Sequence, residues 1–249
     1  MLELRGLTKR FGGITAVDDC SFAVREHSIT GLIGPNGSGK TTVFNLLTGI
    51  YQADRGDMVY RGHSLMGLKT HEIALKGIAR TFQIIRVFPR MSVLDNLLMA
   101  AQQHFGEKWV QSLVRTPAIR RHEREIRDKA GQILGMLNLL PLRDEPAGNL
   151  SYGQQKLLEF GSAIISDPAL VLLDEPAAGV NRTLLNSLLD KIRKLCEQGT
   201  TFLIVEHDMK VVMNLCEWVV VLDHGRAIAA GEPAYIQRHK DVIEAYFGR

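Results

Sequence analysis

Residues 34–41 have the types and spacing of a phosphate-binding loop. They read Gly-Pro-Asn-Gly-Ser-Gly-Lys-Thr, which fits the pattern of a glycine, four variable residues and then Gly-Lys-Thr. Glycines allow positive φ and a close backbone approach, so successive N–H groups can point at a phosphate from a helix N-terminus. We expect Lys40 to bridge the β- and γ-phosphates of a nucleotide and the Thr41 hydroxyl to bind Mg²⁺. The loop residues expected to bind the nucleotide are Gly34, Asn36, Gly37, Ser38, Gly39, Lys40, Thr41 and Thr42.

Two adjacent carboxylates, Asp174 and Glu175, follow the apolar run 170–173. Ligands of open α/β sheets bind at the carboxyl ends of the strands, where this pair would lie. We expect Asp174 to orient Mg²⁺ through a water and Glu175 to polarise an attacking water. An apolar strand ending in Asp-Glu is by itself weak support for a site, but beside a phosphate loop it predicts nucleotide hydrolysis.

The elements that must position these residues alternate between strand-like and helix-like segments, which predicts an α/β fold with a mostly parallel sheet covered by helices. The β-branched segment 28–33 predicts a buried strand before the loop, and 40–48 predicts the helix after it. An amphipathic packing helix is expected at 181–198. Further strands are expected at 78–81, 169–173, 201–205 and 218–222.

Residues 92–145 change to helical periodicity without strand signals, and Ser92 to Asp95 have the spacing of a capping box. We expect an inserted helical subdomain there, which leaves a P-loop core at about 1–91 and 146–249. The segment 120–129 carries both signs of charge and is interpreted as a solvated helix face, because its acids would repel nucleic-acid phosphates.

Composition, charge and cysteine spacing exclude several classes of protein. The 249 residues are 45% hydrophobic and 23% charged, typical of a globular domain, and a net charge of +3 is too weak to argue for a nucleic-acid partner. Cys20, Cys196 and Cys216 have no CxxC spacing, which indicates neither a disulfide framework nor a zinc site and favours a reducing cytosol. We find neither a secretory signal nor a spanning apolar run, so at a membrane another chain would have to hold this one.

Residues 150–155, Leu-Ser-Tyr-Gly-Gln-Gln, resemble the signature motif of the ABC (ATP-binding cassette) transporter ATPases, which most P-loop proteins lack. From the residues alone, a Ser/Gly turn before an apolar-periodic helix is an ordinary helix N-terminus that can bind an anion. The resemblance implies that Ser151, Gly153 and Gln155 contact ATP held by a second ATPase subunit. It also implies the ABC ATPase fold over residues 1–249, with antiparallel β elements beside the P-loop core.

Three more residues match landmarks of that family. The resemblance implies that Phe11 stacks on adenine, that Gln83 touches Mg²⁺ and the attacking water, and that His207 contacts the γ-phosphate. Simpler interpretations exist for each of them: a core aromatic, a surface amide and a solvated histidine. The implied catalytic residues are Glu175, His207 and Gln83, and the implied Mg²⁺ ligands are Thr41, Gln83 and Asp174.

Two residues depart from the common pattern of the family: Tyr152 stands where many members have glycine, and Asn181 where aspartate is usual. Together with Arg-Thr-Phe-Gln at 80–83 and Glu-Pro-Ala-Ala-Gly at 175–179, they resemble the ATPase subunits of branched-chain or hydrophobic amino-acid importers. That resemblance implies transmembrane permeases and a second ATPase subunit as partners, indirectly a solute-binding protein, and no nucleic acid. The expected location is the cytoplasmic face of the inner or plasma membrane.

Two other classes of function share part of this pattern. A soluble ABC ATPase that remodels nucleic acid or ribosomes usually resembles two fused ATPase halves or carries a long coiled coil, and neither fits 249 residues. A small-molecule kinase shares the phosphate loop but lacks the signature motif.

Overall fold

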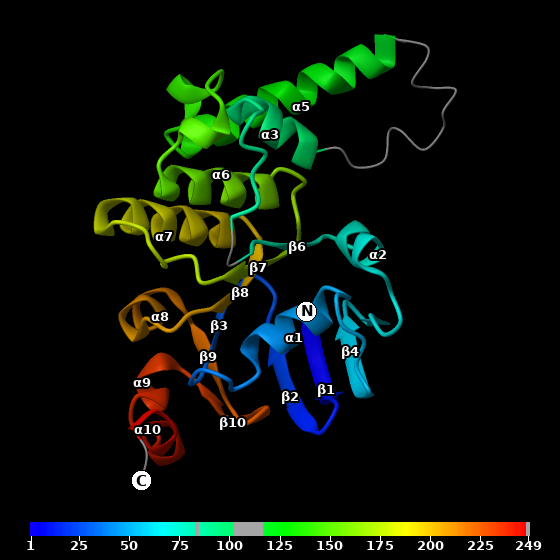
Figure 1. Ribbon diagram of the computed structural model, residues 1–249, viewed down its shortest axis with the longest axis vertical. Helices are drawn as coiled ribbons and strands as arrows, with labels where there is room; N and C mark the ends of the chain where they lie inside the picture. The colour runs from blue at the N-terminus through cyan, green and yellow to red at the C-terminus, as the bar shows by residue number, and fades with distance from the viewer. Residues whose placement is uncertain (83–84, 102–116, 248–249) are drawn as a thin grey trace. The chain divides into compact units, whose positions relative to one another are not determined.

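The computed structural model describes residues 1–82, 85–101 and 117–247 of the chain (Figure 1). They divide into two compact units, which we describe separately. The first unit takes in 1–83, 169–178 and 192–249, and the second takes in 84–168 and 179–191. The second unit therefore extends beyond the segment 92–145 that helical periodicity marks out.

A six-stranded sheet carries the catalytic candidates of the first unit, with strand order β10-β9-β3-β8-β7-β6. Its strands are β3 (Ile29–Ile33), β6 (Ile78–Arg80), β7 (Leu170–Asp174), β8 (Thr201–Val205), β9 (Trp218–Asp223) and β10 (Arg226–Gly231). All pairings are parallel except that of β10 with β9. Every residue of β3, β7 and β8 is buried, as expected for a parallel sheet covered on both faces. The five strands predicted from the sequence are thus confirmed.

A second, antiparallel sheet belongs to the same unit and has the order β2-β1-β4-β5. Its strands are β1 (Leu2–Phe11), β2 (Ile14–Val24), β4 (Arg55–Tyr60) and β5 (His63–Ser64). The register of β1 with β2 shifts several times along the pair. One face of β1 is exposed at alternate residues near its start, as in antiparallel sheets that face water on one side.

Helix α1 (Lys40–Leu47) follows β3 directly and confirms the predicted helix after the phosphate loop. The core of the first unit joins side chains of both sheets with α1, among them Leu2, Leu32, Phe44 and Leu172. Helices α2 (Thr70–Leu75), α8 (Met209–Leu215), α9 (Pro233–Ile236) and α10 (Lys240–Phe247) complete this unit. Helix α7 (Arg182–Glu197), predicted at 181–198, begins in the second unit and ends in the first.

The second unit is helical in its described residues. It holds α3 (Val93–Ala100), α5 (Pro117–Met136), α6 (Tyr152–Ile164) and the short 3₁₀ turns η1 (Leu140–Leu142) and η2 (Ala147–Asn149). Helices α3, α5 and α6 lie together (Figure 1). Ser92 caps α3 by accepting the Asp95 N–H at 3.0 Å, which confirms the N-terminus predicted there. No helix in the described parts of either unit combines the length and apolar character needed to cross a membrane.

Candidate active site

The phosphate loop connects β3 to α1, and its glycines have backbone conformations that other residues rarely adopt. Gly34, Gly37 and Gly39 have φ of +150°, +81° and +105°. A Cβ on Gly34 would lie 2.1 Å from the Leu222 carbonyl oxygen, and one on Gly39 would lie 2.5 Å from the Ala16 carbonyl oxygen. The close approach of neighbouring backbone therefore requires glycine at both ends of the loop.

The other loop residues leave the start of α1 open to a ligand. Asn36 and Thr41 are exposed, Thr42 is half-buried and Ser38 is buried. The N-cap of α1 is Gly39, which has no side chain to bond the first helical N–H groups. Those groups and the helix dipole favour an anion at this end.

Lys40 turns its ammonium group back over the loop. Its Nζ donates to the carbonyl oxygens of Gly34 at 2.8 Å and Pro35 at 2.9 Å. Burial lowers the pKa of Lys40, while the charges of Glu175 and Asp174 act in the opposite direction. The loop thus holds a cation within the electrostatic reach of both carboxylates.

The carboxylates lie at the carboxyl end of β7. Asp174 is the last residue of the strand and is 4% exposed. Glu175 has a left-handed backbone with φ +50°, and its N–H donates to the Val205 carbonyl oxygen of β8 at 2.9 Å. The Glu175 Oε1 lies 3.8 Å from Nδ1 of His207, whose side chain is 60% exposed. The first unit therefore brings together the loop, both carboxylates and His207.

Asp174 has a buried cationic partner that we did not identify as a site residue from the sequence. Arg80, at the end of β6, donates from Nη2 to Asp174 Oδ2 at 2.9 Å. Its Nη1 donates to Asn45 Oδ1 at 2.7 Å and Thr48 Oγ1 at 3.3 Å, both on or next to α1. The two side chains of the ion pair are 6% and 4% exposed. Arg80 therefore ties the Asp174 carboxylate to the helix that follows the phosphate loop.

The signature segment begins α6 in the second unit. Ser151 Oγ accepts the Gln154 N–H at 3.4 Å, and Gln154 Oε1 accepts the Ser151 N–H at 2.9 Å, which makes a reciprocal capping box. Gln155 donates from Nε2 to the carbonyl oxygen of Ala147 at 3.2 Å. The side chains of Ser151 and Gln155 thus fix the start of a helix whose N-terminus is exposed.

The two residues that depart from the family pattern, Tyr152 and Asn181, both make close contacts in the second unit. Asn181 Oδ1 accepts the Leu184 N–H at 2.9 Å, so it caps the start of α7 as well as an aspartate would. The Tyr152 ring covers Gly179, where a Cβ would lie 2.7 Å from Tyr152 Cε1. A Cβ on Gly153 would lie 2.5 Å from Leu184 Cδ2, so the start of α6 packs closely on the Leu184 side chain of α7.

Two aromatic rings lie at the end of β1. Phe11 is its last residue and is 41% exposed, so it is not a core side chain. Its ring meets Tyr51 edge-on at 5.0 Å between centroids. An exposed ring held by a second ring is suited to stacking. Gln83 lies outside the described residues.

Residues 17–178 of the chain match the sequence family described as ABC transporter. The chain belongs to the ABC transporter family. It is an ABC ATPase, with the fold and the class of activity predicted from its sequence.

Curated relatives align with this ABC ATPase along its whole length. The high-affinity branched-chain amino acid transport ATP-binding protein BraF of Pseudomonas aeruginosa is 44% identical over 249 residues, which cover 100% of this chain and 98% of the relative. LivG of Escherichia coli K12, which bears the same description, is 41% identical with the same coverage. The probable LivG of Archaeoglobus fulgidus is 40% identical, covering 100% of this chain and 95% of the relative.

Solved structures agree with the fold of the ABC ATPase. A nucleotide-free ATP-binding cassette from an ABC transporter superposes with a TM-score of 0.86 at 35% identity, covering 100% of this chain and 99% of the other. The ADP conformation of an ATP-binding cassette gives 0.86 at 33% identity with the same coverage.

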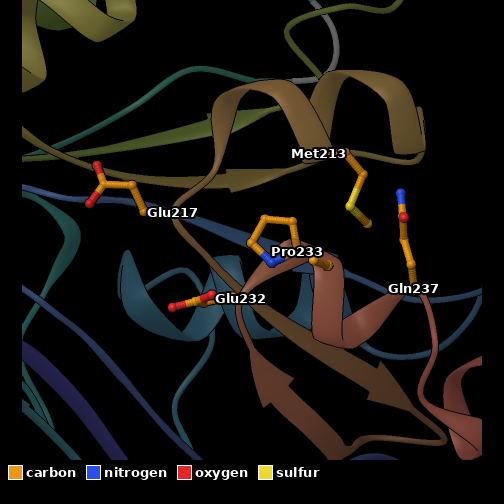
Figure 2. Close-up of a pocket in the computed structure, with 6 residues that line it drawn as sticks. Met213, Glu217, Glu232, Pro233 and Gln237 are labelled. Atoms are coloured by element: carbon orange, nitrogen blue, oxygen red, sulfur yellow. The ribbon is translucent and has the colours of Figure 1, made fainter.

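A pocket of about 500 Å³ lies in the first unit of the ABC ATPase (Figure 2). It is lined by Met213, Glu217, Glu232, Pro233, Ala234 and Gln237. None of the residues predicted to bind nucleotide or to act in hydrolysis lines this cavity.

The Arg80–Asp174 pair of the ABC ATPase predicts a large loss of stability for Arg80→Met. Removal of one partner leaves a buried carboxylate without its counter-charge, which costs about 3–5 kcal/mol. We expect the free energy of unfolding, measured by urea titration without nucleotide, to fall by that amount. The double variant Arg80→Met/Asp174→Asn should recover most of the loss, because the uncompensated charge is gone.

Arg226→Met is the matched control for this prediction. It removes an arginine whose Nη2 lies 2.6 Å from Asp18 Oδ2 in an ion pair at the surface. Surface pairs contribute little, so this variant should unfold close to the wild-type midpoint. An equal loss in the free energy of unfolding for Arg80→Met and Arg226→Met would show that the buried ion pair of Asp174 contributes no more to stability than the surface pair.

Proposed function

We propose that this ABC ATPase powers the import of branched-chain or related amino acids. The observation that carries the proposal is full-length identity of 41–44% to relatives described as branched-chain amino acid transport ATP-binding proteins. The segments 80–83 and 175–179 support it, because they resemble the same subgroup. In this proposal the chain binds transmembrane permeases at the cytoplasmic face of the membrane, and a solute-binding protein delivers the amino acid to them.

The proposed nucleotide site is the phosphate loop with Phe11 against adenine and Lys40 against the β- and γ-phosphates. Loop N–H groups near Gly37 to Lys40 would bind the phosphate oxygens. Phe11 would supply stacking without base-specific hydrogen bonds, so the preference for ATP over GTP should be modest.

Thr41, Asp174 and Gln83 would hold Mg²⁺. In the described part of the chain, no three His, Cys, Asp or Glu side chains gather to bind a metal ion by themselves. This donor set fits Mg²⁺, which keeps several waters and takes only one or two carboxylates together with substrate phosphates. When bound, Mg²⁺ neutralises the charge that develops on the transferred phosphoryl group. Arg80 donates to Oδ2 of Asp174 and would hold this carboxylate in place beside the Mg²⁺.

Glu175 would hold the attacking water and accept its proton. His207 would contact the γ-phosphate, and Gln83 would contact the attacking water. The signature residues Ser151, Gly153 and Gln155 would serve the nucleotide of a second ATPase subunit. ATP binding would then close a dimer, and hydrolysis would reopen it.

Deletion of the gene in the source organism tests the transport proposal. Uptake of labelled leucine, isoleucine or valine should fall and return with the wild-type gene, while labelled glucose uptake should stay unchanged. The tagged chain should co-purify from detergent-solubilised membranes with membrane-spanning subunits. Unchanged uptake of all three amino acids, with the chain recovered only from the soluble fraction, would favour a soluble ABC ATPase.

A further inference from the structure

A buried carboxylate, Glu206, follows β8 directly and is 1% exposed. Acidic side chains are almost never buried to this extent unless they are paired or hydrogen-bonded. β8 lies beside β7, and Val205 is paired with Asp174 at the carboxyl ends of the two strands. Glu206 therefore stands next to the end of the strand that presents the hydrolytic carboxylates.

Each oxygen of Glu206 binds a different segment of the backbone. Oε1 accepts the Ala177 N–H at 2.7 Å, in the turn after β7. Oε2 accepts the N–H groups of His207 at 3.1 Å and Asp208 at 3.4 Å, in the segment after β8. Burial raises the pKa of Glu206, and the hydrogen bonds to these three N–H groups oppose that rise. One side chain thus links the turn that carries Glu175 to the segment that carries His207.

The turn after β7 needs such an anchor because of its backbone. Glu175 has φ +50°, a conformation that few residues other than glycine adopt and that persists only where surrounding contacts enforce it. On one side, the Glu175 N–H donates to Val205 at 2.9 Å. On the other side, the Ala177 N–H donates to Glu206. The Glu206 carboxylate therefore completes the fixation of the turn.

We propose that Glu206 is a positioning residue that fixes the distance between Glu175 and His207. This inference rests on the hydrolytic roles proposed for those two residues. Their side chains come from the two segments that Glu206 joins, and they lie 3.8 Å apart from Nδ1 to Oε1. Glu206 acts through the backbone of both segments and needs no contact with the nucleotide.

Glu206→Gln tests the proposal. A glutamine side chain has one acceptor oxygen and an NH₂ donor, so one of the two segments loses its acceptor. We expect kcat to fall by about 10- to 100-fold, the rate equivalent of one lost hydrogen bond to a charged group. The ATP dissociation constant should stay within about twofold, because phosphate-loop contacts are unchanged and only the hydrolytic step is affected.

A double-variant cycle separates positioning from general stability. In a Glu175→Gln background, Glu206→Gln should slow the residual single-turnover hydrolysis by less than about threefold, because the group that it positions is already lost. Glu206→Asp, which keeps the charge but shortens the reach, should retain part of the rate. Glu217→Gln, the same change at an exposed residue of the first unit, is the control and should leave kcat unchanged.

Several results would overturn the inference. They are a kcat for Glu206→Gln within about twofold of wild type, an equal slowing in the two backgrounds, or failure of both Glu206 variants to fold. Normal turnover in Glu175→Gln itself would instead refute the proposed hydrolytic site. The two failures are therefore distinguishable.

Discussion

Glu175→Gln protein should bind ATP with near-normal affinity and hydrolyse it about 10²–10⁴-fold more slowly, the range that a general base contributes. The amide keeps the size of the side chain but cannot accept the proton of the attacking water. Lys40 and the phosphate loop are untouched, so the loss should lie in kcat and not in the dissociation constant. Phosphate release at saturating Mg²⁺ and ATP measures the rate, and size-exclusion chromatography should show an ATP-bound dimer that accumulates.

The backbone supports this choice of variant. Glu175 has φ +50°, and its own N–H donates to Val205, so a side chain of the same shape should leave the turn in place. Glu217→Gln makes the same chemical change at an exposed position and should hydrolyse ATP normally. Near-normal turnover in purified Glu175→Gln would exclude Glu175 as the catalytic base.

The parallel sheet was predictable because its strands are buried on both faces. The runs at 170–173 and 201–205 are apolar or β-branched throughout. Short runs of this kind that alternate with helical segments are typical of buried strands in a parallel sheet. The phosphate loop at 34–41 begins where β3 ends, and its Gly-Lys-Thr lies at the start of α1. The same loop residues therefore predict both the local fold and the nucleotide site.

The antiparallel sheet was not placed strand by strand from the sequence, for a physical reason. β1 and β2 change register several times, and their exposed faces carry charged residues such as Glu3 and Arg5. Each register shift interrupts the period-two alternation on which strand prediction depends. Gly6, at φ +58°, lies at one of these shifts.

Arg80 and Glu206 illustrate what local patterns omit at the candidate site. Arg80 ends a short strand, and Glu206 directly follows one. A charged side chain that is buried at such a place needs a partner. Their partners depend on strand order: β7 lies between β8 and β6, so Glu206 reaches the turn after β7 and Arg80 reaches Asp174. Sequence alone does not determine that order, and the pairing becomes evident only in three dimensions.

In the proposed composite site, the signature residues of one subunit contact the nucleotide held by the phosphate loop of another. Within one chain, these two segments belong to different units. Ser151 caps α6 and leaves an exposed helix N-terminus. A phosphate loop with Mg²⁺ covers only part of the γ-phosphate. Groups supplied in trans can be worth rate factors of about 10³–10⁵ in related phosphoryl-transfer systems, as for an arginine finger. We therefore expect Ser151 and Gly153 to act on the nucleotide bound to the partner's Lys40.

Mixing two inactive variants tests this arrangement. Lys40→Ala and Ser151→Arg should each abolish hydrolysis alone, the first through lost phosphate contacts and the second through a bulky side chain at the signature segment. In a heterodimer, one site combines the intact Lys40 of one chain with the intact Ser151 of the other, and the second site carries both defects. At equal mixing about half of the dimers are heterodimers, so trapping of labelled nucleotide should reach about a quarter of all sites.

A matched control removes the simplest objection, that Ser151→Arg is inactive because α6 has lost its cap. Ser92 also caps a helix of the second unit by accepting the N–H three residues on, at 3.0 Å. Ser92→Arg therefore removes a comparable cap, worth about 0.5–2 kcal/mol of stability, without touching the signature segment, and it should keep its activity. Normal hydrolysis by monomeric Ser151→Arg, or heterodimers that trap no more nucleotide than the separate variants, would refute the composite site. If the chain forms no homodimer at all, the second subunit must be a different ATPase. Ser151→Arg should then be combined with an alanine substitution of the phosphate-loop lysine in that other ATPase.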